Sequence, residues 1–295
     1  MEVSDKHLET MLEDLNGRVC QLEDEGDPHD LMHAYVNRGT VLLMMGYRTS
    51  AMEDMENALE IAENLGDIDA GTFVRIHASM GSILFDEGDD PSEEYWLAST
   101  RLKEVGRDSV HFDARSLIRT CISVAEDLVD SGHPEDCDPF LSKALEVLSG
   151  NDQWSRNRRV DVWNLSGEAD DDSNDPASAV SSYTAAIDEA VSLMKDGMLE
   201  DPSSLVLALS MRAAARADLH DDEDAVSDLD AAVSLLEGML EHHGLPDTEP
   251  LVALHHDLAG ALMRIGRTEE AERHLIRAME IEVSRSVSGS SGERT

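Results

Sequence analysis

The chain has 295 residues, of which 41% are hydrophobic and only 4% aromatic. Its 63 acidic residues against 23 basic ones give a formal net charge of −40. This length is enough for one large core or for two domains. The acidity repels nucleic-acid phosphate and the few aromatic residues offer little base stacking, so we expect no nucleic-acid partner.

The acidic residues are interleaved with periodic apolar positions along nearly the whole chain, which argues against a disordered acidic tail. Two explanations of the charge stay open. One is a solvated surface adapted to a salty cytosol, where ions screen the self-repulsion, and the other is attraction to a basic partner. The solvated surface is the simpler interpretation.

The three cysteines, Cys20, Cys121 and Cys137, follow no metal or redox spacing. Their odd number indicates reduced thiols, and we expect a cytoplasmic protein in which Cys121 and Cys137 fill core positions. The N-terminus lacks the basic and apolar regions of a signal peptide. The longest apolar run, Val41–Met45, is far shorter than the ~20 residues of a membrane span, so we expect no membrane partner.

Residues 1–28 predict an N-terminal capping helix. Their apolar side chains recur at helical steps and form one stripe. The stripe consists of Leu8, Met11, Leu12, Leu15, Val19 and Leu22.

Residues 29–285 carry a repeated unit of two helices. Each copy has a small residue, a bulky residue four positions later and another small residue three positions beyond that. The copies of this trio are Ala51, Met55 and Ala58; Cys137, Leu141 and Ala144; Ala179, Tyr183 and Ala186; Ala225, Leu229 and Ala232; and Ala271, Leu275 and Ala278. An earlier small residue precedes each trio: Gly39, Ala125, Gly167, Ala213 and Ala259. Helix-stop residues lie between them: Gly46, Gly88, Gly132, Asn174 and Gly266.

A sixth copy is expected around Gly81, where the first helix fits the pattern. In its second helix, Glu93 and Thr100 occupy the expected small positions, so the register of that helix is left open. An alternative apolar stripe consists of Tyr95, Ala98, Leu102 and Val105. After the repeats, residues 286–295 are polar and glycine-rich and predict a disordered tail.

The pattern resembles the tetratricopeptide repeat, whose signature is W-x2-L-G-x2-Y, then A-x3-F, then A. Tyr35, Gly39 and Leu42 match the first half of the signature, and Trp163 with Gly167 match it again. The period of about 42–46 residues is longer than the 34 of the family's commonest form. The resemblance implies an all-α, right-handed superhelical solenoid of about six antiparallel helix pairs.

In that family the first helix of each repeat lines a concave groove that receives a peptide or a partner protein. The resemblance therefore implies partner-binding residues at the matching positions of this chain. These are His33, Asn37, Thr40, Arg75, Ser82, Arg119, Glu126, Asn164, Glu168, Ser210 and His256. Arg75 and Arg119 are cations suited to a partner's carboxylate, although neutralising neighbouring acids explains them equally well. Of the residues that chaperone-binding members use to clamp a carboxylate, only Asn37 is suggestive, so we expect no chaperone tail.

No P-loop, GxGxxG, GxSxG or HExxH pattern is present, and we expect neither a cofactor nor a metal. The pairs His242–His243 and His255–His256 are interpreted as packing or surface residues, because adjacent residues on a helix point about 100° apart. The arginines of Arg156–Arg159 are interpreted as surface salt-bridge residues.

The leading hypothesis is a non-catalytic scaffold or adaptor that binds a protein or peptide along its concave groove. A peptide-sensing regulatory protein is an alternative. A metal-dependent enzyme that uses the C-terminal histidines is a further, weaker one.

Overall fold

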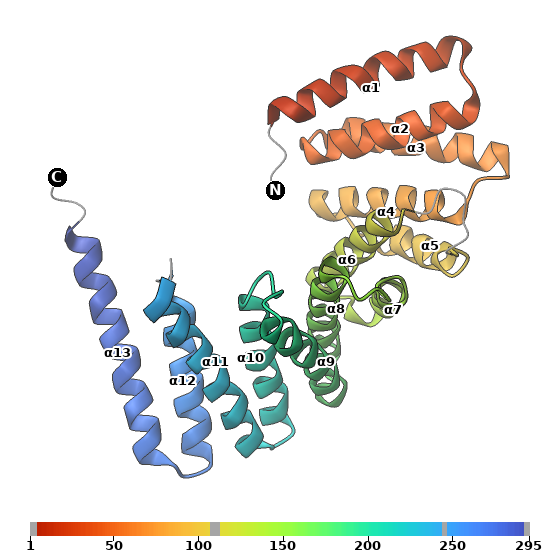
Figure 1. The fold of residues 1–295 in the computed structure, drawn as a ribbon. Coiled ribbons are helices and arrows are strands. Elements are labelled where there is room, and N and C mark those ends of the chain that lie inside the picture. Colours follow the sequence, from red (N-terminus) through yellow and green to blue (C-terminus); the bar gives the residue numbers. More distant parts are fainter. Residues whose placement is uncertain (1–4, 107–112, 244–246, 292–295) are drawn as a thin grey trace. The chain divides into compact units, whose positions relative to one another are not determined.

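The computed structural model describes residues 5–106, 113–243 and 247–291 (Figure 1). Within these ranges the chain forms α-helices and one short 3-10 helix, and no strand. The elements are α1 (Asp5–Glu25), α2 (Pro28–Met44), α3 (Arg48–Leu65), α4 (Ala70–Glu87), α5 (Ser92–Leu102), α6 (Ala114–Asp130), η1 (Pro134–Asp136), α7 (Asp138–Val147), α8 (Gln153–Asp172), α9 (Pro176–Lys195), α10 (Ser203–Asp218), α11 (Asp222–His243), α12 (Glu249–Arg264) and α13 (Thr268–Ser291).

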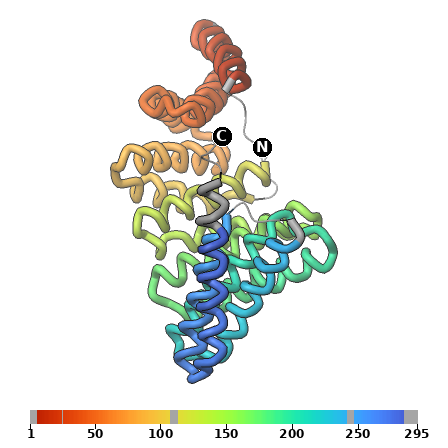
Figure 2. The backbone as a smooth tube through the Cα atoms, turned by 90° about the vertical axis from the view of Figure 1, so that its left-hand side faces the viewer, coloured from red at the N-terminus to blue at the C-terminus, as the bar shows by residue number. Residues whose placement is uncertain are grey.

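The chain divides into two compact units, Met1–Val147 and Leu148–Thr295, called here the N-terminal and the C-terminal unit. The N-terminal unit holds α1 followed by the pairs α2–α3, α4–α5 and α6–α7. The C-terminal unit holds the pairs α8–α9, α10–α11 and α12–α13. Within each unit the two helices of a pair lie side by side (Figures 1 and 2). The predicted all-α class with six antiparallel helix pairs is confirmed. The repeat region that the sequence treats as one domain, 29–285, is shared between the two units.

One residue with a left-handed backbone joins the two helices of every repeat. These residues are Gly46, Gly88, Gly132, Asn174, His220 and Gly266, with φ between 59° and 81°. Glycine and asparagine tolerate this conformation, which explains why these helix ends could be predicted from the sequence. His220 is the exception. It stands at the stop of the fifth repeat, where the sequence pattern offered no glycine or asparagine.

The small residues of the trios lie where the two helices of a pair touch. Ala51, Ala179 and Ala225 are completely buried. At Gly167 a Cβ atom would meet Cε1 of Tyr183 at 2.5 Å, and at Gly39 it would meet Cε of Met55 at 2.9 Å. Both distances are too short for a side chain, so the bulky residue of the trio occupies the space that the glycine leaves.

The second repeat follows the alternative register. Tyr95, Ala98, Leu102 and Val105 are between 0% and 5% exposed, whereas Glu93 is exposed. The register that the sequence left open is therefore the shifted one, in which Tyr95 and Ala98 take the bulky and the second small position. The Tyr95 ring lies where a side chain on Gly81 would be, which aligns Tyr95 with Met55 and Tyr183 of the other repeats.

The predicted capping helix corresponds to α1, which packs against α2 and contributes Val19 of its stripe to a cluster with Met32 and Tyr35. At the other end, α13 continues to Ser291, six residues into the segment predicted to be disordered, and residues 292–295 lie outside the described part. Among the described helices none combines the length and the apolar character needed to cross a membrane.

Candidate functional site

A pocket of about 290 Å³ lies in the N-terminal unit, where the first helices of three successive repeats meet. Its walls come from α2, from the start of α4, from the start of α6 and from Val105. The polar lining residues are His33, Asn37, Asp69, Thr72, Arg75, Asp113, Ser116 and Thr120. Three residues predicted for the groove, His33, Asn37 and Arg75, are therefore brought together in one pocket.

The two pocket aspartates are the N-caps of α4 and α6. The Asp69 carboxylate accepts hydrogen bonds from the backbone N–H of Thr72 (3.2 Å) and from its hydroxyl (2.8 Å). The Asp113 carboxylate accepts one from the backbone N–H of Arg115 (3.1 Å). Capping satisfies N–H groups that have no partner inside the helix, so each carboxylate is held at the pocket by its helix. Neither residue was predicted from the sequence, although an aspartate directly before a helical apolar pattern is a recognisable start signal.

Arg75 lies on α4 beside these aspartates. Its Nε atom is buried and has no hydrogen-bond partner. Burial lowers the pKa of the Arg75 guanidinium, while attraction to Asp69 and Asp113 opposes that shift. Neither carboxylate forms an ion pair with Arg75, nor does any other residue that the structure describes. An arginine stays charged in proteins, so Arg75 is a partly desolvated cation with an unused donor.

The other groove positions of the N-terminal unit do not join the pocket. The Thr40 hydroxyl donates to the backbone oxygen of Val36 (2.7 Å), and Ser82 is hydrogen-bonded to Tyr95 and Asp127. Arg119 and Glu126 are exposed on α6 and do not line the pocket. The pocket lining therefore includes Arg75 but not Arg119.

The groove positions of the C-terminal unit are divided between structural and exposed roles. Asn164 is buried and its Nδ2 donates to the backbone oxygen of Ser204 (3.1 Å), which ties α8 to the start of α10. The Ser210 hydroxyl donates to Leu207 on its own helix (2.9 Å). Glu168 and His256 are exposed.

Two buried ion pairs were also missed in the sequence. Arg38 donates to both carboxylate oxygens of Asp54 at 2.8 and 2.6 Å, and Arg212 does the same to Asp228 at 2.9 and 2.6 Å. Asp54 and Asp228 are only 2% and 4% exposed. The pairs occupy equivalent places in the first and fifth repeats. In both, the arginine directly precedes the small residue of the first helix, and the aspartate follows the first residue of the trio by three positions.

Two of the C-terminal histidines, His255 and His274, pack against each other. His255 is 1% exposed, and its Nδ1 lies 3.1 Å from Nδ1 of His274. Its Nε2 lies 3.5 Å from the Glu237 carboxylate, which Arg277 also contacts at 3.0 Å. Burial lowers the pKa of His255. The packing interpretation of His255 is confirmed, while the side chains of His242 and His243 lie outside the described part.

The two core cysteines behave as predicted. Cys121 and Cys137 are 0% and 1% exposed. Burial raises the pKa of the Cys121 thiol to about 12, so this thiol stays protonated and unreactive at neutral pH.

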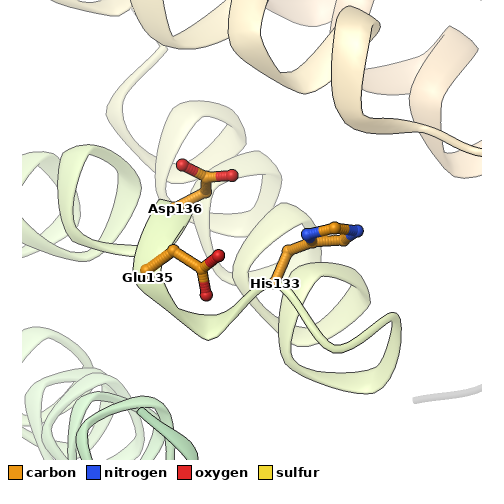
Figure 3. A group of neighbouring side chains, drawn as sticks. All are labelled: His133, Glu135 and Asp136. Carbon is orange, nitrogen blue, oxygen red and sulfur yellow. The ribbon is translucent and has the colours of Figure 1, made fainter.

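One group of potential metal ligands occurs among the described residues, at His133, Glu135 and Asp136 (Figure 3). The three side chains project from one turn around η1, and their ligand atoms lie within 4.8 Å of one another. Ligands on one zinc ion lie about 3.3 Å apart, since each bond is about 2.0 Å long. The two carboxylates are also exposed, so the group is more open than a built metal site.

Comparison with known proteins supports the architecture. Residues 33–65 match the family model of the tetratricopeptide repeat. No curated protein matches the sequence.

Several solved structures share the fold. The apo form of RapI has a TM-score of 0.62 at 13% identity, over 93% of this chain and 76% of that one. The C-terminal part of a TPR repeat-containing protein from Cytophaga hutchinsonii has a TM-score of 0.56 at 14% identity, over 92% and 94%. BtubC (BKLC) from P. vanneervenii has a TM-score of 0.55 at 15% identity, over 95% and 92%. At these identities the likeness concerns the fold alone.

Proposed function

We propose that this chain, in which residues 33–65 match the tetratricopeptide repeat and the helix pairs share the fold of such proteins, is a non-catalytic adaptor that binds a protein or peptide segment. The proposed binding site is the pocket between α2, α4 and α6. The observation that carries the proposal is Arg75, whose buried Nε has no hydrogen-bond partner.

Most arginines of this acidic chain are held by carboxylates. Arg38, Arg156 and Arg212, for example, each lie 2.6 Å from an aspartate or glutamate oxygen. Desolvating a cation is unfavourable unless a partner compensates for the lost water. An anionic group from a bound segment would compensate Arg75, since the guanidinium fork matches a carboxylate.

The remaining lining suits a segment of polypeptide. Asn37 presents both an amide donor and an amide oxygen, and Ser116 and Thr120 add hydroxyl groups from α6. Val74, Val105 and Leu117 supply apolar wall. Mixed polar and apolar walls from three consecutive repeats can contact backbone and side chains of one extended segment, as solenoids do with peptides.

The test is selection of binding peptides from a random display library on the full chain. We expect enriched peptides that carry an acidic residue and bind at micromolar or tighter affinity. Arg75→Gln should weaken them by at least about tenfold, because it removes the charge-assisted hydrogen bonds of the guanidinium.

Arg18→Gln is the matched control, since Arg18 is exposed on α1 and does not line the pocket. It changes the net charge equally and should leave the affinity unchanged. The proposal is wrong if no peptide is enriched, or if the enriched peptides bind the Arg75→Gln and wild-type chains equally well.

A peptide-sensing regulator would use the same pocket, and the cytoplasmic location inferred from the cysteines likewise stays a prediction. The selection experiment bears on the regulator as well as on the adaptor, because a regulator that responds to a peptide must first bind one.

A further inference from the structure

We propose that the pocket selects a ligand that carries a positive and a negative charge close together, as an amino acid or a short peptide does. This inference rests on the proposed function and specifies its ligand. It comes from the two aspartates that lie beside Arg75.

The charges in the pocket are of both signs. Arg75 contributes one positive charge, and Asp69 and Asp113 contribute two negative ones. Both carboxylates act electrostatically on Arg75 without pairing with it. A simple anion placed on Arg75 would therefore also meet the repulsion of two nearby carboxylates.

A second charge on the ligand removes this conflict. Asp69 uses one acceptor position of each oxygen for Thr72, and Asp113 uses one for the backbone of Arg115. A carboxylate has about four such positions, so both can still accept hydrogen bonds from an ammonium group. The ligand's carboxylate would bind Arg75, and its ammonium group would bind Asp69 and Asp113.

The dimensions fit a small zwitterion or the charged portion of a peptide. The pocket's volume of about 290 Å³ lies at the lower end of the range of small-ligand pockets, which is about 300–1,000 Å³. Val74, Val105 and Leu117 add an apolar wall for one aliphatic side chain. The charges can come from the free ends of an amino acid or from adjacent basic and acidic side chains.

The experiment is calorimetric titration of the full chain with probes that differ in charge. Leucine carries both charges, N-acetylleucine only the negative one and leucinamide only the positive one. A Lys-Glu dipeptide capped at both ends carries both charges on its side chains, and inorganic phosphate is a simple anion. We expect leucine or the capped dipeptide to bind at least about tenfold tighter than the three other probes. Which of the two binds identifies the source of the charges.

Three variants locate the interaction. Asp113→Asn removes one charge but keeps the helix cap, because asparagine caps as well as aspartate does. Arg75→Gln removes the opposite charge, and each change should weaken the doubly charged probe by about tenfold or more. Arg119→Gln is the control, since this exposed arginine lies on α6 but outside the pocket lining, and it should change nothing.

The inference is overturned if phosphate or N-acetylleucine binds as tightly as the doubly charged probes, or if neither doubly charged probe binds at about 1 mM, the weak end of specific affinity. Asp113→Asn leaving their affinity intact would also overturn it. Display-selected peptides that require Arg75 but tolerate Asp113→Asn would leave the adaptor proposal standing and refute only this one.

Discussion

The two units use arginine differently. In the C-terminal unit, Arg156 and Arg159 share Glu189, and Arg212 and Arg216 share Asp228. In the N-terminal unit, Arg38 is paired with Asp54, yet Arg75 has no ion-pair partner among the described residues. In a chain with a net charge of −40, this cation is the observation on which the proposed binding site rests.

The largest effect on stability is expected at Asp228, the carboxylate that Arg212 and Arg216 share. Asp228→Ala leaves Arg212 without its carboxylate and Arg216 with only the more distant Asp224 at 3.7 Å. Removing one partner of a buried pair costs about 3–5 kcal/mol. The arginines are 12% and 18% exposed, so we expect the lower end of that range. Asp54→Ala should cost less, because Asp54 pairs with Arg38 alone. Hydrogen exchange of α10–α11 and of α2–α3 would measure the two losses separately.

Asp230→Ala is the matched control, since Asp230 is exposed on the same helix as Asp228. Its effect should stay within about 0.5 kcal/mol. Equal protection factors in the Asp228→Ala and Asp230→Ala chains would show that the buried pair does not hold α10 to α11.

The paired tyrosines give a smaller test. Tyr95 donates its hydroxyl to Asp127, whereas the buried hydroxyl of Tyr183, in the equivalent place of the fourth repeat, has no partner. Tyr95→Phe should destabilise the N-terminal unit by about 1–2 kcal/mol, because the partly buried Asp127 carboxylate loses one of its donors. Tyr183→Phe should leave the C-terminal unit unchanged or slightly more stable. Urea denaturation of both variants checks this, and a larger loss for Tyr183→Phe would contradict it.

The smallest expected effect is a pH dependence of the C-terminal unit. His255 faces His274 and Arg277 on α13 and Glu237 on α11. Its folded pKa lies below the ordinary value of 6.5, so the unfolded chain takes up the proton first. Stability should therefore be complete above about pH 6.5 and should fall as the pH drops toward the folded pKa. One proton limits the slope to about 1.4 kcal/mol per pH unit.

His255→Phe separates this titration from the others, because phenylalanine fills an aromatic position without a titratable group. In thermal melts between about pH 5 and pH 8, the melting temperature of the wild type should fall relative to that of the variant as the pH is lowered, because only the wild type carries the His255 titration. A constant difference across that range would show that His255 does not titrate as inferred. In the second repeat the equivalent slot holds His77, which contacts the Glu94 carboxylate at 2.7 Å rather than a second imidazole.

Much of the fold could be predicted from the sequence because it depends on residues that lie close together in the chain. A small residue must stand wherever two helices touch, as Ala51 and Ala179 do, and this requirement repeats with the period of the helix pair. The stops at Gly46 and Asn174 were legible because few residues adopt a left-handed backbone. Where a residue without that preference takes the position, as His220 does, the pattern has no signal.

The candidate site was harder to predict because its residues come from helices that are far apart in the sequence. The repeat register correctly indicated that His33, Asn37 and Arg75 share a surface, since each holds a matching place on a first helix. It did not indicate Asp69 and Asp113, which precede the helices rather than belong to their periodic faces. Nor did it separate Arg75 from Arg119, which hold the same kind of position but differ in burial.

The sequence by itself determined the helix pairs, their number, five of the six turns within them and the close contacts in every pair except the second, because those features follow from residue size and backbone preference over short spans. Only the tertiary structure decided which charges meet. Arg38 forms an ion pair with Asp54 on a neighbouring helix, and Arg212 does so with Asp228. The two carboxylates beside Arg75 instead accept hydrogen bonds from the helix N-termini that they cap. Whether a cation is neutralised depends on where other helices place their acids, and no local pattern carries that information.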